Sequence, residues 1–443
     1  DVRALTTAQV SALTTSQVAG LSTDNLNALS SAQVTKLSSA QVQALTTTQL
    51  NALTTSDVRE LSATQVAQLT TAQVSALSTT NLNALSTAQE AGLTTAQVSA
   101  LTTDQVSALT TAQVTTLTTS QVKALTTDQL NALATATVQT LGTAQVSALT
   151  TSQVSGISTD NLSALNSAQV SSLTSALVQA LTSSQLNALT SSDIREFTAA
   201  QISQLTTAQV STLSTSTVSA LSTSQVSSLT SALVQALTSD QINSLSTADV
   251  RALTTAQVSA LTTSQVSTLS TDNLTALSSA QVSKLTTSQV QALTTDQISS
   301  LGTTQVSGLS TSQVKALSTS QLGALTTTDV QSLSTVQVAA LTTSQLAGLT
   351  TSNLSALSSR QVAVLSSSQV QSLTTDQISS LTTDDVREFT TSQVAALNTS
   401  QISGFTTDQL SNLTTAQASV FTSAQVHAFS TDQVNAWLVG LSG

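Results

Sequence analysis

The chain has 443 residues, a net charge of −11, and no Pro, Cys, Met or Tyr, with a single His and a single Trp. The acidic balance argues against a nucleic-acid partner, which clustered Lys and Arg would bind, and the lack of Cys excludes a disulfide framework. The hydrophobic content of 39% is too high for intrinsic disorder, while no apolar run approaches the roughly 20 residues that span a bilayer, so we expect no membrane insertion.

The first predicted element, LTTAQVSA at Leu5 to Ala12, recurs every eight residues along the whole chain. Steps of eight from Leu5 reach Trp437 without insertion or deletion and give 55 anchor positions. We number each octad from its anchor, so that Leu5 occupies slot one and Ala12 slot eight. Slot six is almost always Val, Leu or Ile, and slot eight is usually Ala, Ser or Gly, which indicates close packing.

A single continuous helix is excluded, because eight residues turn through about 800° and the Leu stripe would drift by about 80° per octad. A short helix in each octad fits the pattern instead. Slot two is nearly always Thr or Ser, which are favoured N-cap residues, and Gln in slot five completes a capping box. All 17 Asp lie in slots four and five, and nine of the ten basic residues lie in slots seven and eight, as the helix dipole favours.

These observations predict an all-α fold, a superhelical solenoid of very short capped helices with one helix per octad, running from slot three to the next slot one. Helices this short are unstable alone, so stacked neighbours must stabilise them. The alternative is a β-solenoid, because Thr and Val favour strands and Ala8, Val10 and Ala12 alternate with polar residues. Only 11 Gly are available for the corners of such a solenoid, which favours helices.

Several charged residues along the array are candidate sites. Three highly charged segments could present carboxylates to a cation or a partner, but a capping Asp and an Arg at the helix end are the favoured explanation; the segments are Asp57–Glu60, Asp193–Glu196 and Asp385–Glu388. Glu90 occupies the apolar slot six and is predicted to be buried, unless it forms a local defect or reaches solvent along its stem. Asp384 and Asp385 are adjacent, but no spacing matches a calcium-binding loop.

His427 is the only histidine and lies in slot seven. With no Cys and no second His, a metal site with nitrogen or sulfur ligands is excluded. A Ser-His-Asp triad with Asp432 is formally open, but no nucleophile motif accompanies it. We therefore expect no catalytic activity and no cofactor.

Composition divides the chain into an uninterrupted octad solenoid over residues 1–388 and an aromatic-rich terminal region over residues 389–443. The terminal region holds four of the five Phe, the His and the Trp, and a Leu stands where the last N-cap is due. It is either a cap over the last core face or an assembly interface. The interface candidates are Phe405, Phe421, Phe429, Trp437 and Leu438.

The octads LTTAQVSA, LSTDNLNA and LTTDQISS resemble the octapeptide arrays of large secreted bacterial adhesin-like and surface proteins. The resemblance implies an extracellular or cell-surface location and a structural or adhesive role. It supplies no functional residues.

We therefore expect a non-enzymatic extracellular structural protein, either a rod or filament subunit or the stalk of an adhesin. Its partners would be further copies joined end to end, or neighbouring domains of a longer chain. The alternative is a surface- or ligand-binding module, in which the regular Thr and Ser array contacts ice, glycan or peptide.

Overall fold

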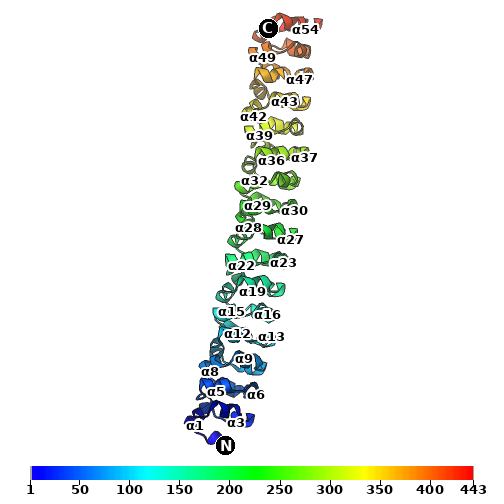
Figure 1. Ribbon diagram of the computed structural model, residues 1–443. Coiled ribbons are helices and arrows are strands. Elements are labelled where there is room, and N and C mark those ends of the chain that lie inside the picture. The colour runs from blue at the N-terminus through cyan, green and yellow to red at the C-terminus, as the bar shows by residue number, and fades with distance from the viewer. Residues whose placement is uncertain (1, 443) are drawn as a thin grey trace. The chain divides into compact units, whose positions relative to one another are not determined.

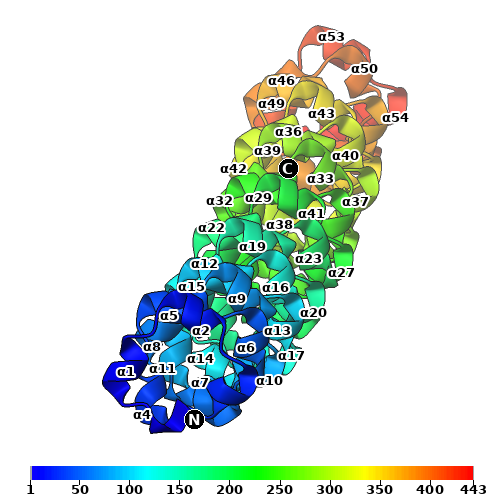
Figure 2. The ribbon, with the colours of Figure 1, turned by 60° about the horizontal axis from the view of Figure 1, so that its bottom comes forward.

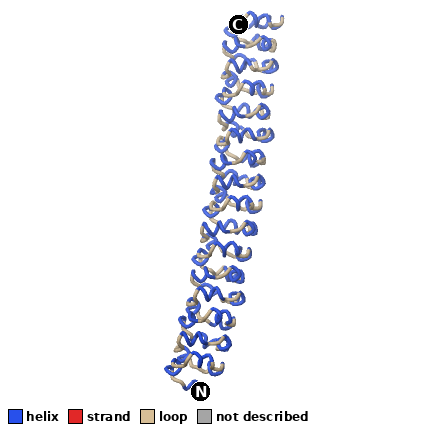
Figure 3. Tube along the Cα trace, viewed as in Figure 1, coloured by secondary structure: helices blue, strands red, loops and turns tan. Residues whose placement is uncertain are grey.

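A computed structural model describes residues 2–442, and these residues form 54 α-helices and no strand (Figure 3). One 3-10 helix, Val2–Ala4, precedes them. The predicted all-α solenoid is confirmed, and the β-solenoid alternative is wrong.

Every helix starts at the same place in the octad. Helix αn begins at residue 8n − 1, which is slot three, from α1 (Thr7–Ser11) to α54 (Thr431–Ser442), and α1 to α53 contain four to six residues each. Most end in slot seven, as does α13 (Thr103–Ser107), or in slot eight, as does α12 (Thr95–Ala100). The four-residue helices are α4 (Ser31–Val34), α17 (Thr135–Val138), α25 (Ala199–Ile202), α35 (Ser279–Val282), α50 (Thr399–Ile402) and α52 (Thr415–Ala418).

The capping box accounts for most helix starts. Before α13, Thr102 has an extended backbone with φ −75° and ψ 160°. The Gln105 N–H donates to Thr102 Oγ1 at 3.1 Å, and the Thr102 N–H donates to Gln105 Oε1 at 2.8 Å. Two of the N–H groups that a helix start leaves without a partner are thereby satisfied. The predicted role of slots two and five is confirmed here.

The helices are shorter than predicted, because the anchor lies outside them. After α12, Leu101 has φ −57° and ψ 143°, and its N–H donates back to Val98 O at 3.2 Å. The next residue, Thr102, must also be extended to act as an N-cap. Two consecutive extended residues therefore separate one helix from the next and change the chain direction once per octad.

Within each of two compact units, Asp1–Leu221 and Ser222–Gly443, successive helices wind into stacked turns (Figures 1 and 2). In the first unit, α9 (Thr71–Ala76) contacts α12, and α13 contacts α16 (Thr127–Ala132). In the second unit, α28 (Thr223–Ser228) contacts α31 (Thr247–Ala252). Most helices thus pack against the helix three octads away, on the neighbouring turn. The compositional division at residue 388 stays a prediction.

The core is built from slots one and six. Val98 and Leu101 are buried, and so are their equivalents in most octads. Slot three faces solvent, as at Thr71 and Thr95. None of the described helices combines the length and the apolar character that a membrane crossing requires.

Slot eight is small because it lies directly on the turn below. A Cβ added to Gly156 would lie 2.6 Å from Thr127 Cγ2, and one added to Gly404 would lie 2.7 Å from Thr375 O. Both neighbours are slot-three residues 29 positions earlier. The close packing predicted for slot eight is confirmed.

Candidate functional site

The glutamine in slot five joins neighbouring turns as well as capping its own helix. Gln105 Nε2 donates to Val74 O at 2.9 Å and to Leu77 O at 2.7 Å. Val74 lies in α9 and Leu77 directly follows it, so these oxygens belong to a helix end, where carbonyl groups lack partners within the helix. The Gln105 side chain is only 2% exposed, yet its oxygen and its amide nitrogen are both hydrogen-bonded.

The same bonds recur in both units. In the second unit, Gln321 Nε2 donates to Val290 O at 2.9 Å and to Leu293 O at 2.7 Å. A Glu in slot five could still complete a capping box, but an ionised carboxylate cannot donate to a carbonyl oxygen. Slot five never holds Glu in this sequence. Asp does occupy slot five in a few octads, as at Asp57, where it caps the helix. The predominance of Gln, with Glu absent, is the signal of the cross-turn role, which the capping analysis of the sequence missed.

The cross-turn offset fits the spacing of one longer sequence repeat. The bonds of slot-five glutamines join residues 28 and 31 positions apart, so one turn spans between three and four octads. The segment SSLTSALVQALTS begins at Ser171 and again at Ser227, 56 residues later. This spacing is twice 28, so an insertion of that length adds two complete turns.

The charged segments are used in the same way. Asp57 Oδ2 accepts hydrogen bonds from the Thr54 N–H at 3.1 Å and from Thr54 Oγ1 at 2.6 Å. Arg59 Nε donates to Ala84 O at 3.2 Å, on the following turn. Capping therefore explains Asp57, and a cross-turn bond explains Arg59.

At three octads where slot five is Asn, namely Asn81, Asn161 and Asn273, a second Asn completes the pattern, whereas the position facing Asn353 is Gly323. Asn81 Nδ2 donates to Leu50 O at 2.9 Å, while the Ser78 N–H donates to Asn51 Oδ1 at 2.7 Å. Asn51 lies in slot seven, 30 residues before Asn81. Two other slot-seven asparagines, Asn27 and Asn83, face octads capped by Asp57 and Gln113, and their Oδ1 atoms have no partner.

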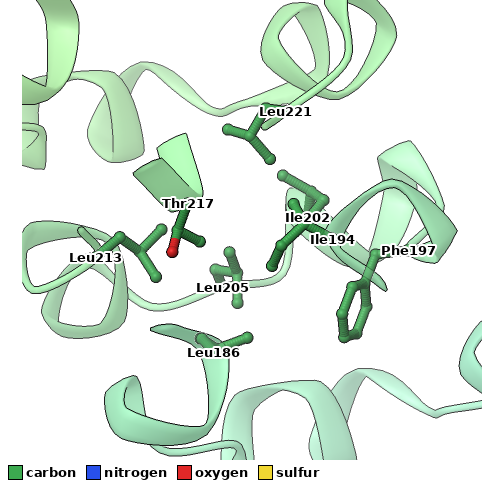
Figure 4. Close-up of a pocket in the computed structure, with 8 residues that line it drawn as sticks. All are labelled: Leu186, Ile194, Phe197, Ile202, Leu205, Leu213, Thr217 and Leu221. Carbon is green, nitrogen blue, oxygen red and sulfur yellow. The ribbon is translucent and has the colours of Figure 1, made fainter. Parts of the chain in front are cut away.

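Slot five is Thr at position 217, and a small apolar cavity of about 10 Å³ lies there (Figure 4). The Thr217 hydroxyl hydrogen-bonds to Asn187 Oδ1 at 3.1 Å and to Ser214 Oγ at 2.8 Å. The cavity is lined by Leu186, Ile194, Phe197, Ile202, Leu205, Leu213, Thr217 and Leu221. Thr is too short to fill the space that Gln occupies in other octads.

Three of the predicted interface residues form one aromatic cluster. The ring centroids of Phe421 and Phe429 are 5.3 Å apart, and Trp437 lies 6.4 Å from Phe421 and 5.9 Å from Phe429. Trp437 Nε1 donates to Ala418 O at 2.8 Å. Phe405 is not among these ring contacts; it is an ordinary buried anchor, 3% exposed, and its carbonyl oxygen accepts a bond from Gln433 Nε2.

Helix α54 is the longest of the described helices because Leu438 cannot act as an N-cap and the helix continues to Ser442. It packs on α51 (Thr407–Ser411) and α52. Gly440 fits closely there, because a Cβ would lie 2.8 Å from Leu410 O. Leu438 and Val439 remain 50% and 56% exposed. The helix thus covers the preceding turn and leaves one apolar pair in contact with solvent.

The remaining candidates do not assemble into a chemical site. His427 Nδ1 donates to Ser423 O at 2.7 Å within α53 (Ser423–His427), and no described hydrogen bond joins it to Asp432. Asp385 caps its helix through Thr382 and also accepts a bond from Ser359 Oγ at 3.2 Å. Among residues 2–442, no group of three or more His, Cys, Asp or Glu is placed to hold a metal ion.

One shallow groove of about 510 Å³ lies in the second unit. It is lined by Lys315, Ala339, Ala340, Leu341, Thr342, Thr343, Val364, Ser366 and Gln369. Val364 and the nearby Val336 are partly or largely exposed, at 38% and 66%. No pair of catalytic groups lines this groove.

The sequence matches the family model described as the ALTTAQ repeat in overlapping segments that cover residues 1–159 and 234–415. No curated protein matches the chain. The unmatched stretch between the two blocks has an unusual density of slot-five residues other than Gln, namely Asn161, Leu177, Asp193, Thr217 and Leu233.

Proposed function

Because this chain belongs to the ALTTAQ repeat family, and because its helices stack in regular turns, we propose that it is a non-enzymatic structural protein that acts as a spacer. In this role it is an extracellular rod or filament subunit, or the stalk of a bacterial adhesin. The extracellular setting follows from the resemblance of its octads to secreted bacterial arrays.

The use of the polar side chains supports this proposal most directly. Gln105 makes capping and cross-turn bonds, and Arg59 and Asp57 hold helix ends. Polar groups that would be free for chemistry in an enzyme are here engaged in joining one turn to the next. In such repeat arrays each unit contacts only its neighbours, so whole turns can be removed while the remaining turns keep their contacts and fold.

Deletion of whole turns tests the spacer function. Removing residues 227–282 takes out 56 residues and joins Val226 to Ser283 in the same register. We expect a folded protein whose length, measured by electron microscopy, falls by about an eighth, in proportion to the turns removed.

A matched deletion of residues 227–286 removes four more residues and breaks the register. It should lose helical circular dichroism and resistance to protease, because slots one and six no longer align. The proposal would be contradicted if both deletion variants kept the same helical circular dichroism and protease resistance, or if the length were unchanged after the 56-residue deletion. Antibody labelling of intact source cells tests the extracellular location, and labelling only after lysis would contradict it.

The exposure of slot three keeps the binding alternative testable. Thr71, Thr95 and Thr119 all face solvent in slot three and form part of a regular hydroxyl array. An ice-binding module would show thermal hysteresis that is lost when such residues along one face become Lys. A spacer would show no hysteresis before or after the change.

A further inference from the structure

Glu90 is a carboxyl group in the apolar core of the first unit. It lies in α11 (Thr87–Ala91), in the slot that holds Val98 and Leu82 in the neighbouring octads. Its side chain is 1% exposed, and neither Oε1 nor Oε2 has a hydrogen-bond partner. A buried carboxylate without a partner is strongly unfavourable, so the neutral acid is the form this site accepts.

No charged group faces Glu90 from the helices around it. The helices packed most extensively against α11 are α8 (Ala63–Gln68) and α14 (Thr111–Thr116), and neither contains a titratable residue. The adjoining α10 (Thr79–Ala84) and α12 contain none either.

Charges lie on two further helices that are hydrogen-bonded to α11. Gln89 bonds to the end of α7 (Thr55–Glu60), whose Asp57, Arg59 and Glu60 are partly or fully exposed. Gln121 of α15 (Thr119–Ala124) donates to Glu90 O, and Lys123 on that helix is exposed.

The turn that contains Glu90 also lies within the ladder of cross-turn bonds. Gln89 Nε2 donates downward to Val58 O at 2.8 Å, and Gln121 Nε2 donates from above to Glu90 O and Leu93 O, both at 2.8 Å. A local opening that brings the Glu90 side chain to water must loosen these bonds. The ionisation of one side chain is therefore coupled to the contact between successive turns.

We propose that Glu90 makes this turn a pH-responsive weak point, which is held closed while the carboxyl is protonated and opens more often as the pH rises. Opening moves Glu90 from the apolar core to water. There it releases its proton, and the carboxylate is stable only in the open form.

The direction of the pH effect, and the pH range in which it occurs, follow from the environments of Glu90 in the closed and open turn. Burial raises the pKa of Glu90 from 4.5 to about 8 in the closed turn, whereas the open turn exposes the group to water. Between these values the closed form retains a proton that the open form has lost, so the stability of the closed form falls as the pH rises. The equilibrium constant for opening should rise about tenfold per pH unit in this range and level off on either side.

Hydrogen exchange followed by mass spectrometry on the full chain tests this proposal. Opening constants are measured from pH 5 to 8 for peptides spanning residues 63–116, after correction for intrinsic exchange rates. The wild type should show the tenfold rise per pH unit near α11. Glu90→Val, which restores the usual slot-six residue, and Glu90→Gln, which cannot ionise, should both show a flat profile.

Glu60→Gln is the matched control, because Glu60 is an exposed carboxyl close in sequence; it should keep the wild-type slope. A wild-type profile as flat as that of Glu90→Val would overturn the proposal. A slope that persists in Glu90→Val would also overturn it, since another group would then be responsible.

Discussion

Asn131 and Asn161, 30 residues apart on neighbouring turns, together make the hydrogen bonds that one glutamine makes in other octads. Asn161 Nδ2 donates to Leu130 O at 3.0 Å and to Leu133 O at 3.3 Å, while the Ser158 N–H donates to Asn131 Oδ1 at 2.8 Å. Asn is one methylene shorter than Gln, so it cannot make both sets of bonds. Asn161 donates to the turn below, and the N–H of its N-cap residue is accepted by another side chain. Asn51 and Asn81 share these bonds in the same way, with Asn51 accepting the Ser78 N–H. Asn243 likewise accepts the Ser270 N–H, which belongs to the N-cap of the helix that contains Asn273.

A double-mutant cycle on this pair should show energetic coupling. Asn131→Ser removes the acceptor for the Ser158 N–H and should lower the free energy of unfolding by about 1 kcal/mol. With Asn161→Gln also present, the new Gln can accept that N–H, so the loss should be smaller. We expect a coupling energy of about 1 kcal/mol from denaturant unfolding. Equal losses in the two backgrounds would show that the two side chains act independently.

Filling the cavity beside Thr217 should increase the stability of the protein. The double variant Asn187→Ser with Thr217→Gln restores the residue types most common in slots seven and five. The new Gln would fill the cavity and bond to the turn below, so the free energy of unfolding should rise by about 1–2 kcal/mol. Thermal unfolding followed by circular dichroism measures the change.

Asn187→Ser alone is the control for that variant. It removes the acceptor of the Ser214 N–H, which donates to Asn187 Oδ1 at 2.7 Å, and should lower the melting temperature. A double variant no more stable than Asn187→Ser would show that the glutamine bonds do not form at this octad.

Much of this fold could be predicted from the sequence, because the same capping residues return in one register. Thr102 and Gln105 show both halves of the box, and their spacing is enough to place a helix start. The helix end was harder to predict. The apolar period places Leu101 in the helix, but the N-cap that follows it requires an extended backbone.

The contacts between turns could not be placed without the structure, because they depend on how many octads complete one turn. Asn51 and Asn81 look unrelated until an offset of 30 residues is known to bring them together. The three aromatic residues that cluster at the end of the second unit share the octad spacing with Phe405. Their composition alone did not separate the cluster of Phe421, Phe429 and Trp437 from that ordinary core residue.

The exposed apolar pair on α54 tests end-to-end assembly. If Leu438 and Val439 mediate contact between copies, the wild type should show concentration-dependent sedimentation, and Leu438→Ser with Val439→Ser should sediment as a monomer. Burial of these side chains between copies would supply the driving force. Val336→Ser, at a side chain that is 66% exposed in the array, is the control and should leave association unchanged. Identical sedimentation of the wild type and the α54 variant would contradict a role for this pair.

The cross-turn glutamine bonds are the central claim, and one helix offers a matched pair of substitutions. Gln289 and Gln291 both lie in α36 (Thr287–Ala292); Gln289 is buried and donates to Val258 O and Leu261 O, whereas Gln291 is exposed. Each change to Glu adds one negative charge to the same helix. The carboxylate at position 289 could still accept the Thr286 N–H but could not donate to the turn below.

The most direct measurement is therefore the free energy of unfolding of Gln289→Glu and Gln291→Glu at neutral pH, determined by denaturant titration. We predict a loss of about 3 kcal/mol for Gln289→Glu, because Leu261 O and Val258 O each lose the Gln289 donor, Val258 O keeping only the Leu261 N–H, and because a charge is buried. Gln291→Glu should change stability by less than about 0.5 kcal/mol. Equal, small effects of the two substitutions would contradict the claim that slot-five amides hold successive turns together.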